Sequence, residues 1–291
     1  FKPTAQSSDL NTITTNFPVD MMLDNRLAGS SVNTATADRL RDPYYLATAS
    51  TDAEANSGIS GWFASNTTIT PRLYGGNPTA VYCFGRAPGF FDEVCYTGTG
   101  APNTLSHNLG VAPELIILKR RNGIGDWPVY CGQLETPLSK VIYLNQTGSA
   151  QTSSNTWQNI TTTTFGFNAT GYYFNGNGDT YVAYLFATCP GVSKVGAYTG
   201  TAASQAIDCG FAAGARFVMI KRTDGTGDWY TYDTARGMSS GSDPYILLNS
   251  TAAQITGTNY VNSTTGGFTL TASAPAALNG NGATYIYLAI A

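Results

Sequence analysis

Histidine is nearly absent from this chain of 291 residues: there is one, His107. No serine or aspartate motif of a hydrolase surrounds it. A catalytic triad needs a histidine placed by such partners, and zinc sites are commonly built from several histidines or paired cysteines. We therefore expect His107 to lie in a surface loop. We also expect the protein to be neither an enzyme nor dependent on a metal or other cofactor.

Charged residues are scarce as well. They make up 11% of the chain, whereas about 25% is usual in soluble domains. The 15 basic and 18 acidic residues leave a net charge of −3, and no basic run marks a phosphate-binding surface. Apolar residues reach 42% but never form the unbroken run of roughly 18 that a membrane-spanning helix needs. The composition argues against a nucleic-acid partner and against membrane insertion.

The five cysteines follow no pairing pattern. They are odd in number, lack a C-x-x-C motif and do not recur at equivalent positions of the repeat described next; they are Cys83, Cys95, Cys131, Cys189 and Cys209. Cysteine is often buried as a small apolar residue. We expect unpaired thiols in the core rather than a disulfide framework.

The chain does contain a long internal repeat. Residues 119–127 (KRRNGIGDW) return about one hundred residues later as 221–229 (KRTDGTGDW), and residues 175–187 match 279–291. This period is longer than that of solenoid repeats, which is roughly 20–50 residues. Each copy is therefore the size of a domain.

A third, divergent copy occupies the N-terminal part. Residues 76–84 resemble 178–186, and residues 17–23 resemble 111–117, but the Gly-Asp-Trp turn is missing. The predicted domains are a divergent β module and two β-sandwich repeats, at residues 1–92, 93–187 and 188–291. The linkers between them are short, so we expect semi-rigid stacking of modules, each with its own core.

The hydrophobic pattern indicates β-strands almost throughout. Residues 115–118 and 217–220 are short apolar runs that end in Lys-Arg, and residues 228–233 alternate with period two. A glycine-rich turn at 223–227 joins two such strands into a hairpin. With no amphipathic helical period, the sequence predicts an all-β fold of tandem antiparallel β-sandwich, jelly-roll-like modules of about one hundred residues.

The repeated turn residues have two interpretations. Asp126-Trp127 and Asp228-Trp229 are predicted to be structural, because an aspartate at a turn can hydrogen-bond loop amides. Glycan cleavage would instead require two carboxylates about 5 to 10 Å apart. Candidate acids are Asp126, Glu135, Asp179, Asp228, Asp233 and Asp243. They form no convincing pair in the sequence, so we favour the structural role.

Four aromatic residues invite a binding interpretation. Trp62, Trp157, Tyr172 and Tyr173 have polar neighbours, and their rings could stack on sugars or line an interface. Strand alternation alone would bury many of these aromatic rings. Burial in the core is therefore the competing interpretation.

The order of these motifs resembles the tandem modules of tailed-bacteriophage fibre and appendage proteins. It is carried by PELIILKR at 113–120, the two Gly-Asp-Trp turns, Ala235-Arg236-Gly237, LNST at 248–251 and NGDTYVAY at 177–184. The resemblance implies β-sandwich modules in a non-enzymatic virion protein displayed outside the particle. The second repeat departs from this pattern at Cys131, where the third has Asp233, so a role of that aspartate is not shared.

These observations together predict a structural virion protein of a tailed phage: a fibre, decoration or host-adhesion subunit at the virion surface. We expect self-association into a homo-oligomer, by analogy a trimer, with other virion proteins and host-surface polysaccharide as partners. Two alternatives stay open. One is a secreted carbohydrate-binding module array or glycan-active enzyme, and the other is an extracellular filament subunit.

Overall fold

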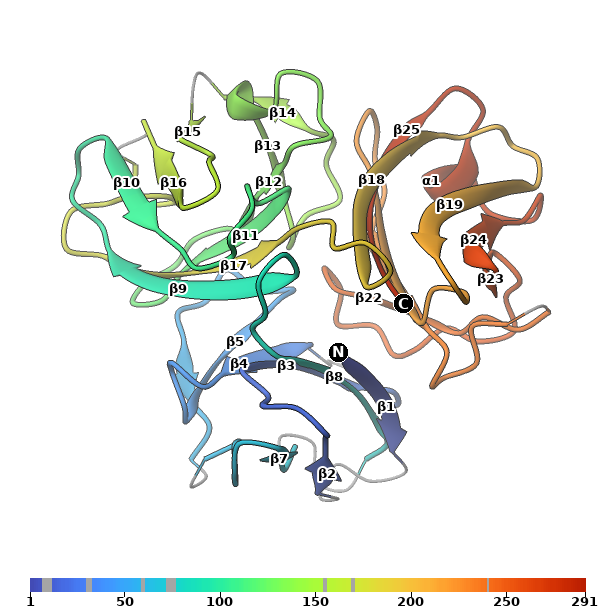
Figure 1. Cartoon of the computed structure of the whole chain (residues 1–291), viewed down its shortest axis with the longest axis horizontal. Helices are drawn as coiled ribbons and strands as arrows, with labels where there is room; N and C mark the ends of the chain where they lie inside the picture. Colours follow the sequence, from blue (N-terminus) through green and yellow to red (C-terminus); the bar gives the residue numbers. More distant parts are fainter. Residues whose placement is uncertain are drawn as a thin grey trace.

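The computed structural model describes residues 1–6, 12–29, 33–58, 61–71, 77–153, 156–168, 171–239 and 241–291. Its strands form antiparallel sheets in three modules (Figure 1), and the predicted all-β sandwich fold is confirmed. In the described part, helix is limited to η1 (Pro137–Ser139) and α1 (Ala276–Asn279).

The strands divide evenly among the modules. The first module contains β1 (Lys2–Gln6), β2 (Ile13–Thr14), β3 (Met21–Arg26), β4 (Ala35–Asp38), β5 (Tyr44–Ala47), β6 (Ala55–Asn56), β7 (Thr68–Ile69) and β8 (Thr79–Phe84). The second contains β9 (Phe91–Thr97), β10 (Asn103–Ser106), β11 (Leu115–Arg120), β12 (Pro128–Cys131), β13 (Lys140–Tyr143), β14 (Gln151–Thr152), β15 (Trp157–Gln158), β16 (Thr164–Phe167) and β17 (Thr180–Phe186). The third contains β18 (Ser193–Thr199), β19 (Gln205–Phe211), β20 (Phe217–Arg222), β21 (Trp229–Asp233), β22 (Tyr245–Leu247), β23 (Val261–Thr264), β24 (Gly266–Leu270) and β25 (Thr284–Ile290).

All three modules share one strand order. The large sheets run β1-β8-β3-β4-β5-β6, β9-β17-β11-β12-β13-β14 and β18-β25-β20-β21-β22. A smaller sheet covers each: β2-β7, β10-β16-β15 and β19-β24-β23. The registers match as well, because Met21, Leu115 and Phe217 start β3, β11 and β20 and face Phe84, Phe186 and Ile290. These registers define the equivalent positions used below.

Each large sheet is buried on both faces. Along β17, Tyr181 and Leu185 pack between the two sheets of the second module, whereas Tyr184 and Phe186 point out of that module. Side chains alternate across a strand, so a strand with two buried faces shows a continuous apolar run. This explains why residues 115–118 carry no alternating pattern.

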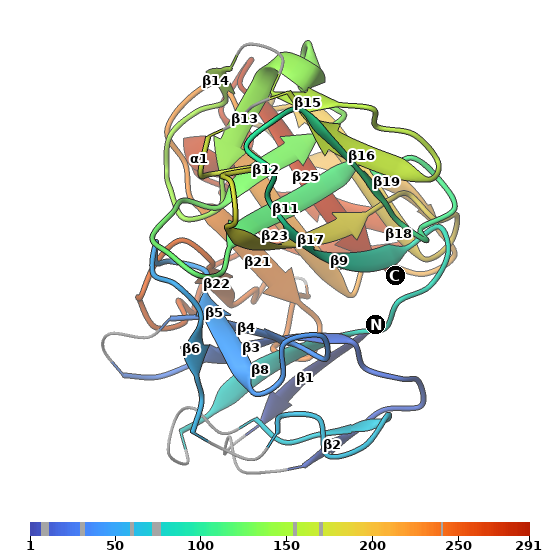
Figure 2. The same ribbon diagram turned by 90° about the vertical axis from the view of Figure 1, so that its left-hand side faces the viewer.

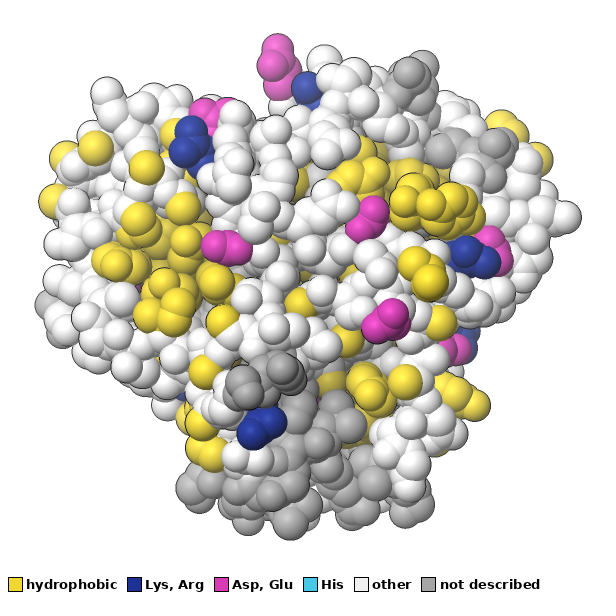
Figure 3. Space-filling model, turned by 180° about the vertical axis from the view of Figure 1, so that it is seen from behind, with side chains coloured by type: hydrophobic (Ala, Val, Ile, Leu, Met, Phe, Trp, Pro, Cys, Tyr) yellow, Lys and Arg dark blue, Asp and Glu magenta, His cyan; other side chains and the backbone are white. Residues whose placement is uncertain are grey.

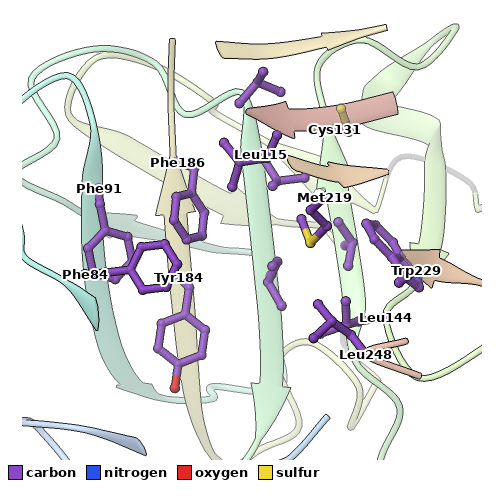
Figure 4. Packing of buried hydrophobic residues seen from close by; sticks show 14 of the residues in the cluster. Phe84, Phe91, Leu115, Cys131, Leu144, Tyr184, Phe186, Met219, Trp229 and Leu248 are labelled. Atoms are coloured by element: carbon purple, nitrogen blue, oxygen red, sulfur yellow. The ribbon is translucent and has the colours of Figure 1, made fainter. Parts of the chain in front are cut away.

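The outward faces of the three large sheets meet in a central core (Figure 4). The central core is built from all three modules, with Met21, Tyr82 and Phe84 from the first, Ile117, Tyr184 and Phe186 from the second, and Phe217, Met219 and Leu288 from the third. Packing leaves a cavity of only about 30 Å³ among these side chains. Each large apolar side chain buried there contributes roughly 1.5–3 kcal/mol.

The expected end-to-end stacking of modules was therefore wrong. Each module does have a core of its own, between its large and small sheets. The largest apolar cluster, however, is the shared one, and the modules close around it instead of forming a row (Figures 1 and 2). The physical reason is the second apolar face of each large sheet, which a linear array would leave in water.

Candidate functional site

The Asp-Trp pair that ends each glycine-rich turn is hydrogen-bonded to an asparagine two strands later, just after β13 in the second module and just after β22 in the third. Asn145 Nδ2 donates to Asp126 Oδ1 at 2.7 Å, and Asn145 Oδ1 accepts the Trp127 backbone N–H at 3.0 Å. In the third module the equivalent asparagine makes the same two bonds, at 2.7 Å to Asp228 and 2.8 Å to Trp229. Both carboxylates thus hold a turn in shape.

The two turn tryptophans reach into the preceding module. Trp127 Nε1 of the second module donates to the Ser50 carbonyl of the first at 3.0 Å. Trp229 Nε1 of the third donates to the Tyr143 carbonyl of the second at 2.9 Å. Both indoles are buried in the central core. Each tryptophan therefore joins two modules.

A buried lysine accompanies each tryptophan. Lys119 Nζ donates to the carbonyls of Gly125 at 2.6 Å and Thr51 at 2.8 Å, and Lys221 Nζ donates to the carbonyl of Thr147 at 2.9 Å. Thr51 and Thr147 belong to the preceding module. Burial lowers the pKa of both lysines to about 8, although the nearby turn aspartates oppose the shift.

An Asp-Arg-Tyr joint links the first module to the second. Asp38 and Arg41 form a fully buried ion pair at 2.5 Å within the first module. Tyr184 of the second module donates its hydroxyl to Asp38 Oδ2 at 2.7 Å and accepts Arg41 Nη2 at 2.8 Å. The tyrosine adds one hydrogen bond to each member of a charge pair that its burial would otherwise penalise.

The same joint links the third module to the first. Asp233 and Arg236 form a buried ion pair, and Tyr82 of the first module donates to Asp233 Oδ2 at 2.8 Å. Arg236 Nη2 in turn donates to the Tyr82 oxygen at 3.0 Å. Burial raises the pKa of Tyr82, which keeps this hydroxyl protonated.

The joint between the second and third modules is apolar. Cys131, Leu134 and Leu288 stand where the other joints carry aspartate, arginine and tyrosine, and all three pack in the central core. All three polar residues of the joint are thus replaced here by cysteine or leucine. The sequence held a signal for these joints, an Asp-x-x-Arg spacing at both 38–41 and 233–236. The two clear repeats do not share this spacing, because Cys131 and Leu134 occupy the equivalent positions of the second module.

Tyr172 and Tyr173 form an aromatic pair at the surface. Their ring centroids lie 4.2 Å apart, and Tyr172 is 46% exposed. The guanidinium of Arg120 lies 5.7 Å from the Tyr172 ring, and the Tyr143 ring lies 6.4 Å from that of Tyr173. A hydrogen bond with Tyr172, helped by burial, raises the pKa of Tyr173 to about 12. We call these four residues the tyrosine platform.

A comparison with protein-family models finds a match to a domain of unknown function, DUF7483, over residues 61–291. The chain belongs to this family. The DUF7483 match starts within the first module and includes β8, so it spans Tyr82 as well as Tyr184. No curated protein matches the chain significantly.

The other two predicted binding aromatics are buried, so the interpretation of exposed rings was wrong for them. Trp62 is 0% exposed and donates its indole N–H to the Pro43 carbonyl at 3.3 Å. Trp157 is 1% exposed and donates to the Lys140 carbonyl at 3.1 Å. Both fill module cores, where neither ring can stack on a sugar.

His107 is also buried, contrary to the expected surface loop. Its exposed fraction is 5%, Nδ1 accepts the Leu109 backbone N–H at 3.1 Å, and Nε2 lies 3.2 Å from the Thr161 carbonyl. The ring thus fastens a turn to the neighbouring loop. The five cysteines are free thiols, and three of them are buried: Cys83, Cys131 and Cys209.

The acids considered for catalysis have structural partners in most cases. Asp179 accepts Arg120 Nη2 at 2.6 Å, and Asp243 accepts the Tyr260 and Val261 backbone N–H groups at 2.5 and 2.6 Å. Glu135 is exposed. Among the described residues, no three His, Cys, Asp or Glu side chains gather as a metal site, and no helix there is long and apolar enough to cross a membrane.

Proposed function

We propose that the chain is a structural protein of a tailed-phage virion, a fibre, decoration or host-adhesion subunit displayed at the virion surface. The observation that carries this proposal is that several of the few charged side chains form contacts between modules. Asp38, Arg41, Lys119 and their counterparts in the third module are committed to joints between modules. Modules held rigidly together in this way suit a virion subunit that resists mechanical force and exposes binding surfaces.

The surface supports the same proposal. Figure 3 shows a face made largely of hydroxyl, amide and backbone atoms, with scattered charged side chains and several apolar areas. Such a surface favours contact with other proteins over contact with polyanions. We propose self-association into a homo-oligomer, trimeric by analogy with fibres, and binding to other virion proteins.

Peptide mass spectrometry of gradient-purified phage particles tests this proposal. The chain should be present in fixed copy number per particle and should stay bound through washing at high salt, because its surface carries little charge. Antibodies against the chain should label intact particles in electron micrographs. Recovery of the chain only in the particle-free fraction would contradict the proposal.

The tyrosine platform favours a second function, the binding of host-surface polysaccharide. The exposed Tyr172 ring can stack on the apolar face of a sugar, and the Arg120 guanidinium lies 5.7 Å from this ring. A glycan array read with the native chain and with Tyr172→Ala/Tyr173→Ala tests it. Glycan binding that the double variant loses supports this function, while equal binding by both proteins, or none, leaves the structural role alone. Trp62→Ala serves as a control for general loss of folding.

A further inference from the structure

The three joints differ in what lies at their outer ends. Between the first and second modules, Glu54 accepts two hydrogen bonds from Arg121, both at 3.0 Å, and one from Arg41 Nη1 at 3.4 Å. The backbone N–H of Glu54 also donates to the Arg121 carbonyl, at 2.8 Å. We call these three residues the clamp, because their side chains tie the two modules together.

A shorter version of the clamp closes the joint between the third and first modules. Gln254 stands at the position of Glu54, and its backbone N–H donates to the Leu27 carbonyl at 3.3 Å. Arg236 Nη1 donates to Gln254 Oε1 at 3.2 Å. Long polar side chains thus fill the outer end of this joint as well.

The joint between the second and third modules keeps the backbone contact, since the N–H of Ala150 donates to the Thr223 carbonyl at 2.8 Å. The clamp positions, however, hold residues that are small or apolar: Ala150, Thr223 and Leu134. All three line an open groove of about 680 Å³. This volume lies within the range of roughly 300–1,000 Å³ that is usual for ligand sites.

One wall of the groove is a face of the third module's large sheet. Thr199 of β18 stands opposite Thr284 of β25, and Thr284 Oγ1 lies 2.7 Å from Oγ1 of Thr223, which follows β20. Because residues directly opposite each other on antiparallel strands share a face, the three side chains form a threonine row across the sheet. Ala197 and Ile286 stand two residues away along β18 and β25, so they add aliphatic surface to the same wall.

The opposite wall belongs to the second module and is polar as well. It contains the amide of Gln133, which is exposed, and the hydroxyl of Ser149. Lys140 also lines the groove, and its ammonium group donates to Thr152 Oγ1 at 3.2 Å. Both walls therefore offer hydrogen-bond donors and acceptors to a bound molecule.

The charged groups of the groove balance one another. Glu135 and Lys140 line the wall of the second module, and Asp224 lines that of the third. Asp224 is paired with Arg222 at 2.8 Å, which leaves one carboxylate and one ammonium group to meet a ligand. Such a lining attracts neither anions nor cations overall, so it favours a neutral ligand.

The sheet wall offers side chains rather than backbone groups to a ligand. β25 is hydrogen-bonded to β18 on one side and to β20 on the other, so a molecule lying over this face meets the threonine row. A hydroxyl both donates and accepts, so each threonine can pair with a sugar hydroxyl in either role, while Ala197 and Ile286 can contact the C–H groups of the sugar. A peptide would need a deep apolar pocket for an anchoring side chain, and the aliphatic residues of this wall are few.

Aromatic stacking does not contribute to this groove. Two tyrosines touch it, but their hydroxyls donate to carbonyls within the third module, both at 2.6 Å: Tyr198 to Leu278 and Tyr285 to Ala276. Both rings pack in or against the core of that module. We therefore expect weak binding by a single groove, which several copies of the chain held in one assembly would strengthen.

We propose that this groove binds a short neutral oligosaccharide. The threonine row and the polar side chains of the second module supply its hydrogen bonds, and those made by Glu135 and Lys140 are charge-assisted. The site occurs at the joint whose clamp positions carry small or apolar residues. It shares no residue with the tyrosine platform, so the two binding proposals can succeed or fail separately.

The test is NMR titration of the whole chain with soluble neutral trisaccharides of glucose, mannose and galactose, because weak binding is best measured in solution. Ala150→Glu/Thr223→Arg is the filled variant, since it places the glutamate and arginine of the clamp in the groove. Ala101→Glu/Thr163→Arg makes the same charge changes at exposed positions outside the groove and is the control. Thermal unfolding confirms that both variants fold.

We expect at least one of these sugars to shift the amide signals of Thr199, Thr284 and Gln133. It should bind the native chain and the control at least tenfold more tightly than the filled variant. Thr199→Val/Thr284→Val removes two hydroxyls of the threonine row with little change of shape, and should weaken binding about tenfold.

Several results would overturn the proposal. They are the absence of shifts with every sugar, equal binding by the filled variant, and full binding by the double valine variant. Tighter binding of trigalacturonate than of the neutral sugars would also overturn it, because the site would then select an anion. Loss of the shifts in Tyr172→Ala/Tyr173→Ala would assign the sugar to the tyrosine platform instead, and shifts caused only by short serine-alanine peptides would make the groove a peptide site.

Discussion

Tyr184 of the second module donates a hydrogen bond to Asp38 of the first at 2.7 Å, across 146 positions of sequence. The same hydroxyl accepts Arg41 at 2.8 Å. A single phenol thus hydrogen-bonds to both members of a buried ion pair in another module. The contact explains how modules with separate cores become one body.

Removing that hydroxyl should weaken the whole chain. Tyr184→Phe leaves the ring in the central core but strips Asp38 of a donor and Arg41 of an acceptor, so we expect a loss of about 1–3 kcal/mol in the free energy of unfolding. Urea denaturation measures it. Tyr44→Phe, on a ring that is 39% exposed, is the matched control and should change stability by less than about 0.5 kcal/mol. Equal effects of the two changes would contradict the role given to Tyr184.

The apolar joint should be transplantable. The triple variant Asp233→Cys/Arg236→Leu/Tyr82→Leu gives the joint between the third and first modules the residues of the joint between the second and third. We expect its free energy of unfolding to be unchanged or higher by up to about 4 kcal/mol. Arg236→Leu alone should cost about 3–5 kcal/mol, because it leaves a buried carboxylate unpaired. Denaturation of the single and triple variants checks this. A triple variant less stable than the single would show that the three positions do not act as a unit.

Glu93 makes stability depend on pH. The carboxyl is 3% exposed, and neither oxygen has a hydrogen-bond partner among the described residues. Burial, with Asp38 nearby, raises its pKa to about 9. The folded chain then holds a proton that the unfolded chain releases near pH 4.3. The contribution of Glu93 to stability is therefore fully present below that pH and is lost progressively as the pH rises toward 9.

Glu93→Gln should remove this loss. The variant should be more stable than the native chain at pH 8, and its stability should vary less between pH 5 and 9. Denaturation midpoints at several pH values give the answer. Glu135→Gln, at an exposed carboxyl, should leave the profile unchanged. A native profile that stays flat over this range would disprove a protonated Glu93.

The two turn asparagines should contribute equally. Asn145→Ala and Asn249→Ala each leave a turn aspartate and a tryptophan N–H without their partner, at an expected cost of about 1–3 kcal/mol apiece. Asn108→Ala, at an exposed side chain, provides the comparison. Unequal losses would mean that the repeated turns do different structural jobs.

Much of the fold could be predicted from the sequence, because it depends on local patterns. The repeat, the hairpin at 223–227 and the apolar runs at 115–118 and 217–220 all come from neighbouring residues. The central core could not be predicted in this way. An apolar run shows that β11 is buried on both faces, but nothing local tells that the second face meets Phe217 and Leu288 from another module.

The candidate site was harder to predict for a related reason. Trp62 and Trp157 have polar neighbours in sequence, yet each points into the core of its module. Alternation determines which residues share a face of a strand, but not which of the two faces is exposed to solvent. Tyr172 and Tyr173 have similar neighbours, and Tyr172 does reach the surface. The joints depend on pairs such as Tyr82 and Asp233, which lie 151 positions apart.

Scanning calorimetry tests most directly whether the modules share one core. The chain should unfold in a single transition whose calorimetric and van't Hoff enthalpies agree. Trp62→Ala, which alters only the private core of the first module and costs about 3–5 kcal/mol, should move the whole transition to lower temperature. Two or three separate transitions, with the variant shifting one of them alone, would contradict the account.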